Sequence, residues 1–195
     1  MPVYAGGLPL LARRFLEEFA FSGGLYYFAV VTYGMWPGRA LAQVSDLLEH
    51  RGVRLSYARA VKSVENNIFA FRVPKEDKIQ TILLDSDEKA RRIARDVTER
   101  KYRPAGRAIL PPKSYYEKTV AAYPGRDKEF VVDQSCTRCG QCGDVCPVGN
   151  ITVSEDGVEF HHHCESCFAC VHWCPRAAIQ VGDKTRGKER YHEPR

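Results

Sequence analysis

Apolar and polar positions alternate with two different periods in the first hundred residues. Apolar side chains recur at i, i+3 and i+4 over residues 8–19 and 40–48, which predicts two amphipathic helices. Residues 25–31 form a continuous aromatic and β-branched run, as in a strand buried on both faces, and residues 55–61 predict a weaker strand. Alternating strands and helices predict a parallel sheet with helical crossovers.

Shorter elements are expected on either side of these. Val3 and Tyr4 precede a glycine turn and are typical of the end of a strand. Residues 79–83 predict a short helix, and Asp85 with Glu88 can form a capping box that starts another helix. The first region is therefore expected to run strand, helix, strand, helix, strand, helix.

From residue 102 to 129 the periodic pattern is interrupted by prolines and glycines, which predicts a linker with one short helix near residues 115–122. The remaining strand signals are short. They lie at residues 130–133, at a hairpin of 151–153 with 158–160, and at 178–181. These short strands surround every cysteine of the chain.

The eight cysteines form two runs that both read C-x2-C-x2-C-x3-C-P. Each cysteine of the second run follows its counterpart by 28 residues, so one half-domain is used twice. Such runs hold 4Fe-4S clusters, and the fourth cysteine of each run ligates the other cluster. We therefore assign one cluster to Cys136, Cys139, Cys142 and Cys174, and the second cluster to Cys164, Cys167, Cys170 and Cys146.

Disulfides, zinc and inert buried thiols are the alternatives. A disulfide framework is typical of a small secreted chain, whereas eight cysteines in 195 residues are not dense. Zinc prefers two pairs of ligands with a long spacer, not four cysteines within eleven residues, repeated. Inert thiols would not recur at identical offsets. The iron–sulfur interpretation is favoured over all three.

Composition and charge exclude some classes of function. The hydrophobic content of 44% is ordinary for a globular protein of one or two domains, and no apolar run approaches the roughly 18 residues of a membrane span. The start of the chain lacks a secretion signal, so a cytoplasmic protein is expected. The formal charge of +5 counts the cysteines as neutral. Two clusters of about −2 each would bring it near neutrality, so nucleic-acid binding is not implied.

Several side chains beside the cysteine runs invite interpretation. His161, His162 and His163 are expected to be solvated, because adjacent residues on a strand point to alternate faces. Phe168 and Trp173 are expected to shield a cluster from water. The basic residues of the tail are expected to form a solvated surface, with docking of an acidic redox partner as the alternative: Lys184, Arg186, Lys188 and Arg190.

The chain resembles the EFR-type flavodoxin-ferredoxin fusion proteins of anaerobic bacteria and archaea. The resemblance rests on the cysteine runs, on Pro2-Val3-Tyr4-Ala5-Gly6-Gly7 and Thr32-Tyr33-Gly34-Met35, and on the closing Gly182-Asp183-Lys184-Thr185 and Tyr191-His192-Glu193-Pro194. It implies an α/β flavodoxin-like domain with a partial parallel sheet, followed by a small α+β two-cluster ferredoxin domain. The implied parts are residues 1–101, a linker of 102–129, the ferredoxin domain of 130–182 and a polar tail of 183–195.

The resemblance also implies an FMN site. In that family the loops after the third and fourth strands flank the flavin at the carboxyl edge of the sheet. The residues implied to contact the isoalloxazine are Tyr4, Gly6, Gly7, Thr32, Tyr33, Gly34 and Trp36.

The chain departs from the family at the flavin phosphate. The Ser/Thr- and Gly-rich loop that holds it is absent, and the chain starts where the third strand should already be ending. We therefore expect that the native protein begins further upstream. An exposed sheet edge would be covered by a partner subunit or a second copy.

The function expected from these features is electron transfer in anaerobic redox metabolism. Two 4Fe-4S clusters would pass single electrons between redox protein partners, and FMN would convert one-electron to two-electron chemistry. No residue presents as a nucleophile or general base with a recognisable partner, so a carrier or reductase component is favoured over a stand-alone enzyme. The alternative is a cofactor-free α/β docking module that delivers a ferredoxin domain to a partner oxidoreductase subunit.

Overall fold

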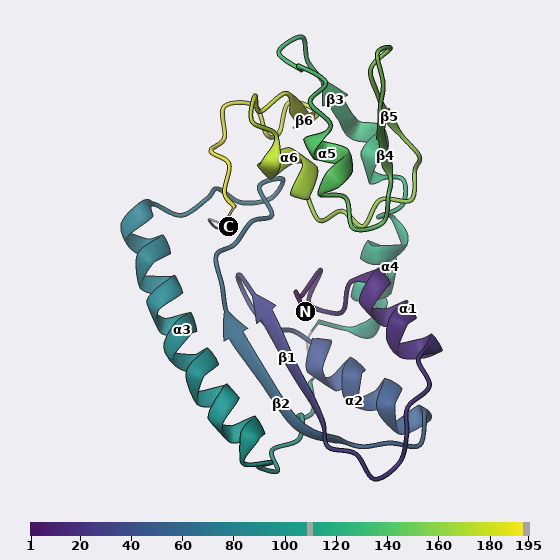
Figure 1. The fold of residues 1–195 in the computed structure, drawn as a ribbon, viewed down its shortest axis with the longest axis vertical. Helices are drawn as coiled ribbons and strands as arrows, with labels where there is room; N and C mark the ends of the chain where they lie inside the picture. The colour runs from purple at the N-terminus through teal and green to yellow at the C-terminus, as the bar shows by residue number, and fades with distance from the viewer. Residues whose placement is uncertain (109–110, 193–195) are drawn as a thin grey trace. The chain divides into compact units, whose positions relative to one another are not determined.

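The structure, a computed structural model, describes residues 1–108 and 111–192. Its elements divide between two compact units (Figure 1). The first unit comprises residues 1–64 and 74–120, and the second comprises residues 65–73 and 121–195. Glu193 and Pro194, part of the resemblance at the end of the tail, lie outside the described residues.

The first unit is built on a parallel pair of strands, as the pattern predicts. β1 (Tyr27–Tyr33) pairs in parallel with β2 (Leu55–Lys62), and α2 (Ala40–His50) makes the connection between them. Isolated parallel bridges extend the pair on both edges, from Pro2 to Thr32 and from Tyr57 to Arg103. The structure thus shows a small mixed α/β unit with two strands and no more extensive sheet among its described residues.

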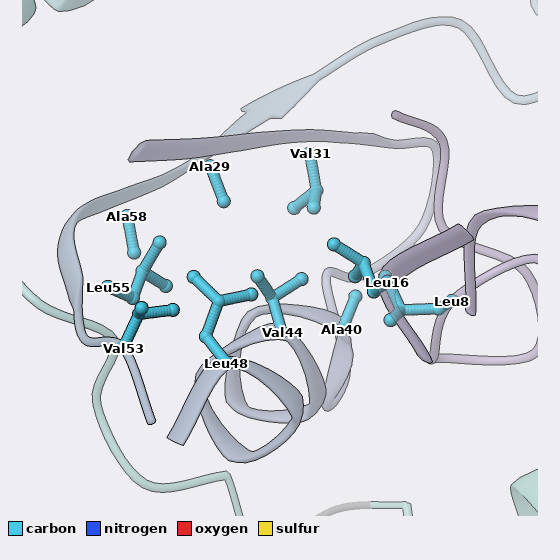
Figure 2. Packing of buried hydrophobic residues seen from close by; sticks show 10 residues of the cluster. All are labelled: Leu8, Leu16, Ala29, Val31, Ala40, Val44, Leu48, Val53, Leu55 and Ala58. Carbon is cyan, nitrogen blue, oxygen red and sulfur yellow. The ribbon is translucent and has the colours of Figure 1, made fainter. Parts of the chain in front are cut away.

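The core of this unit lies between the strand pair and the helices α1 (Leu10–Glu18) and α2. Alternate residues of β2 point to opposite faces of the pair. Ala58 therefore joins the α2 side, whereas Tyr57 and Val61 pack with Ile93 of helix α3 (Glu76–Thr98) on the other side. Figure 2 shows the α2 side, where the buried side chains are Leu8, Leu16, Ala29, Val31, Ala40, Val44, Leu48, Val53, Leu55 and Ala58.

Two expectations for this unit were wrong. Residues 76–98 form one continuous helix, α3 (Glu76–Thr98), in place of two short ones. Asp85 lies in its interior and pairs with Lys89 one turn later (2.7 Å), so its carboxylate is not a cap. The run at β1 is not buried on both faces either, because Phe28 is 54% exposed.

The stretch expected as a linker contains α4 (Lys113–Ala121), close to the predicted short helix. Tyr116 of this helix is buried in the first unit and its hydroxyl donates to the carbonyl oxygen of Leu8 (2.7 Å). A short 3-10 helix, η1 (Arg126–Glu129), follows in the second unit, where Asp127 is buried.

The second unit repeats the same elements twice. β3 (Phe130–Val132), α5 (Gln141–Asp144) and β4 (Ile151–Val153) form the first half, and β5 (Val158–Phe160), α6 (Ala169–Trp173) and β6 (Ile179–Val181) form the second. The strands pair across the halves, β3 with β6 and β4 with β5, both antiparallel. Each small sheet therefore takes one strand from each half.

Residues 65–73, between β2 and α3, also belong to the second unit. Ile68 is 1% exposed and packs in an apolar cluster with Val171 and Ile179. The carbonyl oxygen of Ile68 accepts a hydrogen bond from Lys188 Nζ (2.6 Å). We call this stretch the covering segment, because it closes part of the second unit's core.

Candidate metal centre

Two cavities in the second unit are lined by cysteines. One is bounded by Cys136, Cys139, Cys142 and Cys174, and the other by Cys146, Cys164, Cys167 and Cys170. Each takes three cysteines from one run and the fourth from the other run. The free space between their walls, part of it open to solvent, is about 330 Å³ in the first and about 340 Å³ in the second.

The backbone around the two cavities repeats with the same 28-residue offset as the sequence. Left-handed φ angles occur at Arg138 and Ser166 (both 54°) and at Gly140 and Phe168 (83° and 58°). These conformations turn the chain sharply between successive cysteines, so that several sulfur atoms of one run can face one space.

Backbone N–H groups point at the sulfur atoms in the same repeated pattern. Arg138 donates to Cys136 Sγ at 3.4 Å and Ser166 to Cys164 Sγ at 3.2 Å. Four residues after the last cysteine of each run the pattern recurs, from Asn150 N to Cys146 Sγ and from Ala178 N to Cys174 Sγ, both at 3.2 Å. Such donors stabilise a thiolate and the negative charge of a cluster bound to it.

The donor set and its spacing fit iron–sulfur clusters. Each cysteine of a 4Fe-4S cluster binds its own iron atom, so four sulfur atoms need only border a common space. Zinc would instead draw four sulfur atoms to about 2.3 Å from one point. In the described part of the chain, no group of three or more Cys, His, Asp or Glu side chains is arranged to hold a single ion.

Burial makes the thiols of Cys164, Cys167 and Cys170 weaker acids until a metal replaces the proton. It raises the pKa of Cys164 to about 12 and that of Cys170 well above its ordinary value. Because iron binds the thiolate form, loading this cavity must release protons.

Aromatic side chains cover the second cavity. Phe168, expected to shield a cluster, is 6% exposed and lines the cavity, and Phe69 of the covering segment stacks on it with ring centroids 6.4 Å apart. Trp173 instead stacks on His192 at 4.1 Å. The sequence pattern does not predict this cover, although the apolar Ile68-Phe69-Ala70-Phe71 run is a local signal of a buried contact.

His172 of α6 joins the covering segment to the C-terminal tail. It is 3% exposed, its Nε2 donates to the carbonyl oxygen of Asn66 (2.6 Å), and its Nδ1 accepts from the backbone N–H of Tyr191 (3.0 Å). These two bonds fix one neutral tautomer, and burial lowers the pKa of the ring.

The basic tail was expected to form a solvated surface, but Lys188 and Arg190 are half-buried.

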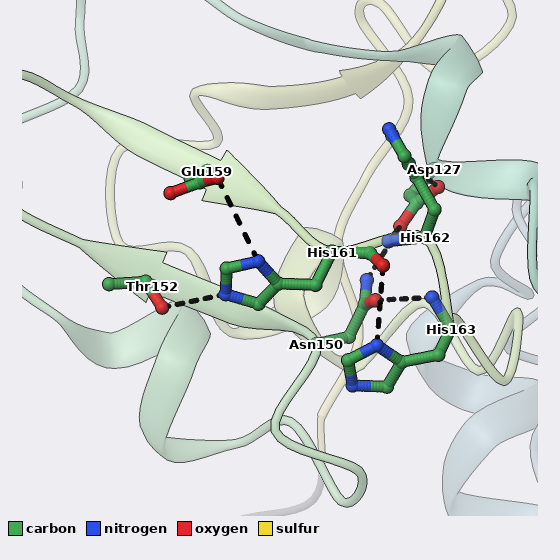
Figure 3. Close-up of polar contacts among 7 residues, drawn as sticks. All are labelled: Asp127, Asn150, Thr152, Glu159, His161, His162 and His163. Atoms are coloured by element: carbon green, nitrogen blue, oxygen red, sulfur yellow. Dashed lines mark hydrogen bonds and ion pairs between the residues drawn. The ribbon is translucent and has the colours of Figure 1, made fainter.

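The three consecutive histidines are exposed, as expected, but they follow the end of β5 and are not part of a strand. His162 has a left-handed φ of 61°, and its backbone N–H and Nδ1 both contact the buried carboxylate of Asp127 (3.1 and 2.8 Å). Asn150 donates to the same carboxylate (2.7 Å) and accepts from the N–H of His163 (2.7 Å; Figure 3). This network positions the chain just before Cys164.

The residues implied to contact a flavin come together only in part. Tyr4 and Gly7 close a tight turn through two backbone hydrogen bonds (2.9 and 2.8 Å), and Thr32 at the end of β1 accepts from the N–H of Val3 (2.9 Å). Tyr33 is the last residue of β1, and Gly34 and Trp36 follow it. The turn after the first bridge and the loop after β1 thus meet at the carboxyl edge of the parallel pair.

That arrangement does not fit a flavin ring against the glycines. A Cβ on Gly6 would lie 2.9 Å from Pro111 and 3.3 Å from Trp36, and one on Gly7 would lie 2.4 Å from the ring of Tyr116. The chain's own side chains therefore occupy the space beside both glycines, and a flavin would have to displace them.

Two cysteine-lined cavities within an intertwined repeat define an iron–sulfur protein of the two-cluster type. Residues 128–175 match the family model described as a 4Fe-4S dicluster domain. The chain is 37% identical over 59 residues to an uncharacterized ferredoxin of Methanocaldococcus jannaschii, covering 27% of this chain and 77% of that protein. Through this domain the chain belongs to the 4Fe-4S dicluster ferredoxins.

A second relative is larger. Over 58 residues the chain is 38% identical to a subunit of the ion-translocating oxidoreductase complex of Methanosarcina acetivorans. The match covers 29% of this chain and 22% of that relative's length. Among the described residues, no helix combines the length and apolar character needed to cross a bilayer.

Proposed function

We propose that the protein transfers single electrons between redox protein partners through two 4Fe-4S clusters. The observation that carries this proposal is the composition of the two cavities, each with three cysteines of one run and the fourth of the other. When bound, the clusters supply the one-electron chemistry. In this proposal Cys136, Cys139, Cys142 and Cys174 hold one cluster, and Cys146, Cys164, Cys167 and Cys170 hold the other.

The remaining residues position and tune these ligands. The N–H groups of Arg138, Asn150, Ser166 and Ala178 donate to sulfur and favour the more negative, reduced state. Phe168 and its apolar neighbours limit the access of water. No proton transfer or nucleophile is required, because an electron is the species that moves.

Paired cysteine substitutions test the crossed ligand sets. Wild-type protein reconstituted anaerobically is expected to hold about eight irons per chain. Cys142→Ser with Cys174→Ser should lose one cluster and keep about four irons, because both residues serve the same site. Cys142→Ser with Cys146→Ser should lose both clusters. Iron and sulfide assays with EPR of the reduced protein provide the measurement. The assignment would be contradicted if the Cys142→Ser, Cys146→Ser variant kept about four irons and the Cys142→Ser, Cys174→Ser variant kept none.

We propose that the first unit binds no cofactor and docks to a partner oxidoreductase subunit. The packing of Tyr116, Trp36 and Pro111 against the glycine turn supports this over the FMN site. The oxidoreductase complex to which one relative belongs supports a redox protein as partner. We also propose a cytoplasmic location and a role in anaerobic metabolism, in which low-potential clusters avoid oxygen.

FMN content separates the two proposals for the first unit. The protein reconstituted with iron, sulfide and FMN should retain no flavin after desalting. One FMN per chain would show that the glycine turn opens, and would restore the flavin to the electron-transfer route.

A further inference from the structure

The repeat allows the two cluster loops to be compared position by position. Gly140 corresponds to Phe168 (6% exposed) and Gly143 corresponds to Val171, which is fully buried. Asp144 is exposed, whereas its counterpart His172 is 3% exposed. Since the backbone follows the same path in both halves, the difference arises from the side chains and from what covers them.

Two additions cover the second loop. The covering segment places Phe69 on Phe168, and the tail brings the N–H of Tyr191 onto His172. Among the described residues of its own unit, no equivalent layer covers the first loop: Thr137, Arg138 and Cys139 are all exposed. The first cavity thus has an exposed cysteine, Cys139, whereas the cysteines of the second cavity are half-buried or, at Cys170, buried.

The rim of the first cavity is basic. Arg138 and Arg176 both line it and both are exposed, and no carboxylate side chain is among its lining residues. The guanidinium of Arg138 donates to the backbone oxygen of Glu155 (2.9 Å), a neutral acceptor, so this bond does not pair it with a carboxylate. Neither arginine forms an ion pair within the described residues.

We propose that the two clusters are unequal, and that the cluster held by Cys136, Cys139, Cys142 and Cys174 exchanges electrons with an acidic redox protein docked on Arg138 and Arg176. This inference rests on the proposed electron-transfer function. The covered cluster then exchanges electrons through the first one. In each outward step one electron leaves the exposed cluster, which is oxidised, and reduces the partner by one electron, with no proton or ligand transferred. Carboxylates of the partner would face the two arginines, which steers its approach.

Charged inorganic oxidants test this without knowing the partner. Holoprotein reduced with dithionite is mixed in a stopped-flow instrument at low salt with ferricyanide, an anion, or with hexaammineruthenium(III), a cation. Arg138→Glu is compared with Lys184→Glu, which makes the same charge change at an exposed lysine 4.1 Å above the ring of Phe69, on the covered side. Arg176→Glu provides a second variant in case Arg138→Glu disturbs its loop.

Arg138→Glu and Arg176→Glu should each slow ferricyanide oxidation about tenfold at low salt and accelerate oxidation by hexaammineruthenium(III), and both effects should shrink as salt is added. Lys184→Glu should change either rate less than about twofold. The inference would be overturned if Lys184→Glu changed the oxidation rates as much as or more than the two arginine variants, or if neither arginine variant changed them.

Iron content and the EPR spectrum of each reduced variant are measured in parallel. Wild-type protein without clusters would remove both the proposed function and this inference. If every variant holds both clusters but Lys184→Glu changes the oxidation rates more than the arginine variants do, the inference is wrong and the proposed electron-transfer function is unaffected.

Discussion

Ile68→Ala should loosen the covering segment and expose the second cluster. Ile68 is 1% exposed and lies in the apolar cluster of the second unit with Val171 and Ile179. Truncation of such a side chain to alanine costs about 3 kcal/mol, combining lost burial with the cavity left behind. The polar anchors of the segment, at Asn66 and at the backbone of Ile68, stay in place.

If the segment opens as a local unit, about 3 kcal/mol raises its opening constant by about two orders of magnitude. A water-soluble iron chelator under anaerobic conditions then reports the opening, because cluster loss bleaches the visible absorbance. Iron release should become biphasic, with about four irons per chain lost about a hundredfold faster and the other four lost near the wild-type rate.

Phe71→Ala is the matched control, since Phe71 belongs to the same segment but is 40% exposed. Its iron release should stay within a few-fold of the wild type. A single slow phase in Ile68→Ala, within twofold of wild type, would refute the claim that this segment protects the second cavity. Equal acceleration of all eight irons would show that the segment supports the whole unit and does not protect one site.

Three further outcomes are expected. Lys101 and Tyr57 hold the pKa of Asp96 below its ordinary value, so the stability from this carboxylate is present above about pH 4 and is lost as the pH falls through the folded-state pKa. Burial raises the pKa of Tyr57 to about 12, so the free energy of unfolding should also fall between about pH 10 and 12. The urea midpoint, followed by far-UV circular dichroism as a function of pH, should show both losses. Asp96→Asn should remove the decrease at acid pH and Tyr57→Phe the decrease at alkaline pH, and variants with the wild-type pH dependence would contradict the assignment. Gly7→Ala should lower the free energy of unfolding of the first unit by about 2 kcal/mol or more, because the new Cβ would lie 2.4 Å from the Tyr116 ring. Gly23→Ala is the control, since its Cβ would meet no described atom within 4 Å, and equal unfolding midpoints for the two variants would disprove the clash. Asp127→Ala should cost about 2–3 kcal/mol by leaving buried donors unpaired, and a thermal midpoint equal to wild type would argue against the network in Figure 3.

The sequence predicts the second unit well because cysteine spacing is a local signal. Identical offsets impose identical turns, and the short strands at 130–132, 151–153, 158–160 and 179–181 lie where the pattern places them. The parallel pair and α2 follow equally from periodicity. A capping box at Asp85 is a weaker signal, since the same residues also support an i, i+4 pair inside a longer helix.

Tertiary contacts between distant parts of the sequence are what the pattern cannot supply. Nothing local in residues 65–73 indicates that Phe69 stacks on a residue 99 positions later, or that Asn66 accepts from His172. The glycine turn shows the same limit. Gly6 and Gly7 are compatible with an open ligand loop or with close packing of Tyr116, and only the tertiary contact decides between them.

The exchange of strands between the halves has a consequence for assembly. Each half contributes one strand to both small sheets, so a single 28-residue half could complete them only by dimerising with another copy. Joining the halves in one chain makes their encounter intramolecular and independent of protein concentration. Under the proposed ligand sets each cluster is also a cross-link, with three sulfur bonds to one half and one to the other. Removing iron would then act on this domain as reduction acts on a protein held together by disulfides.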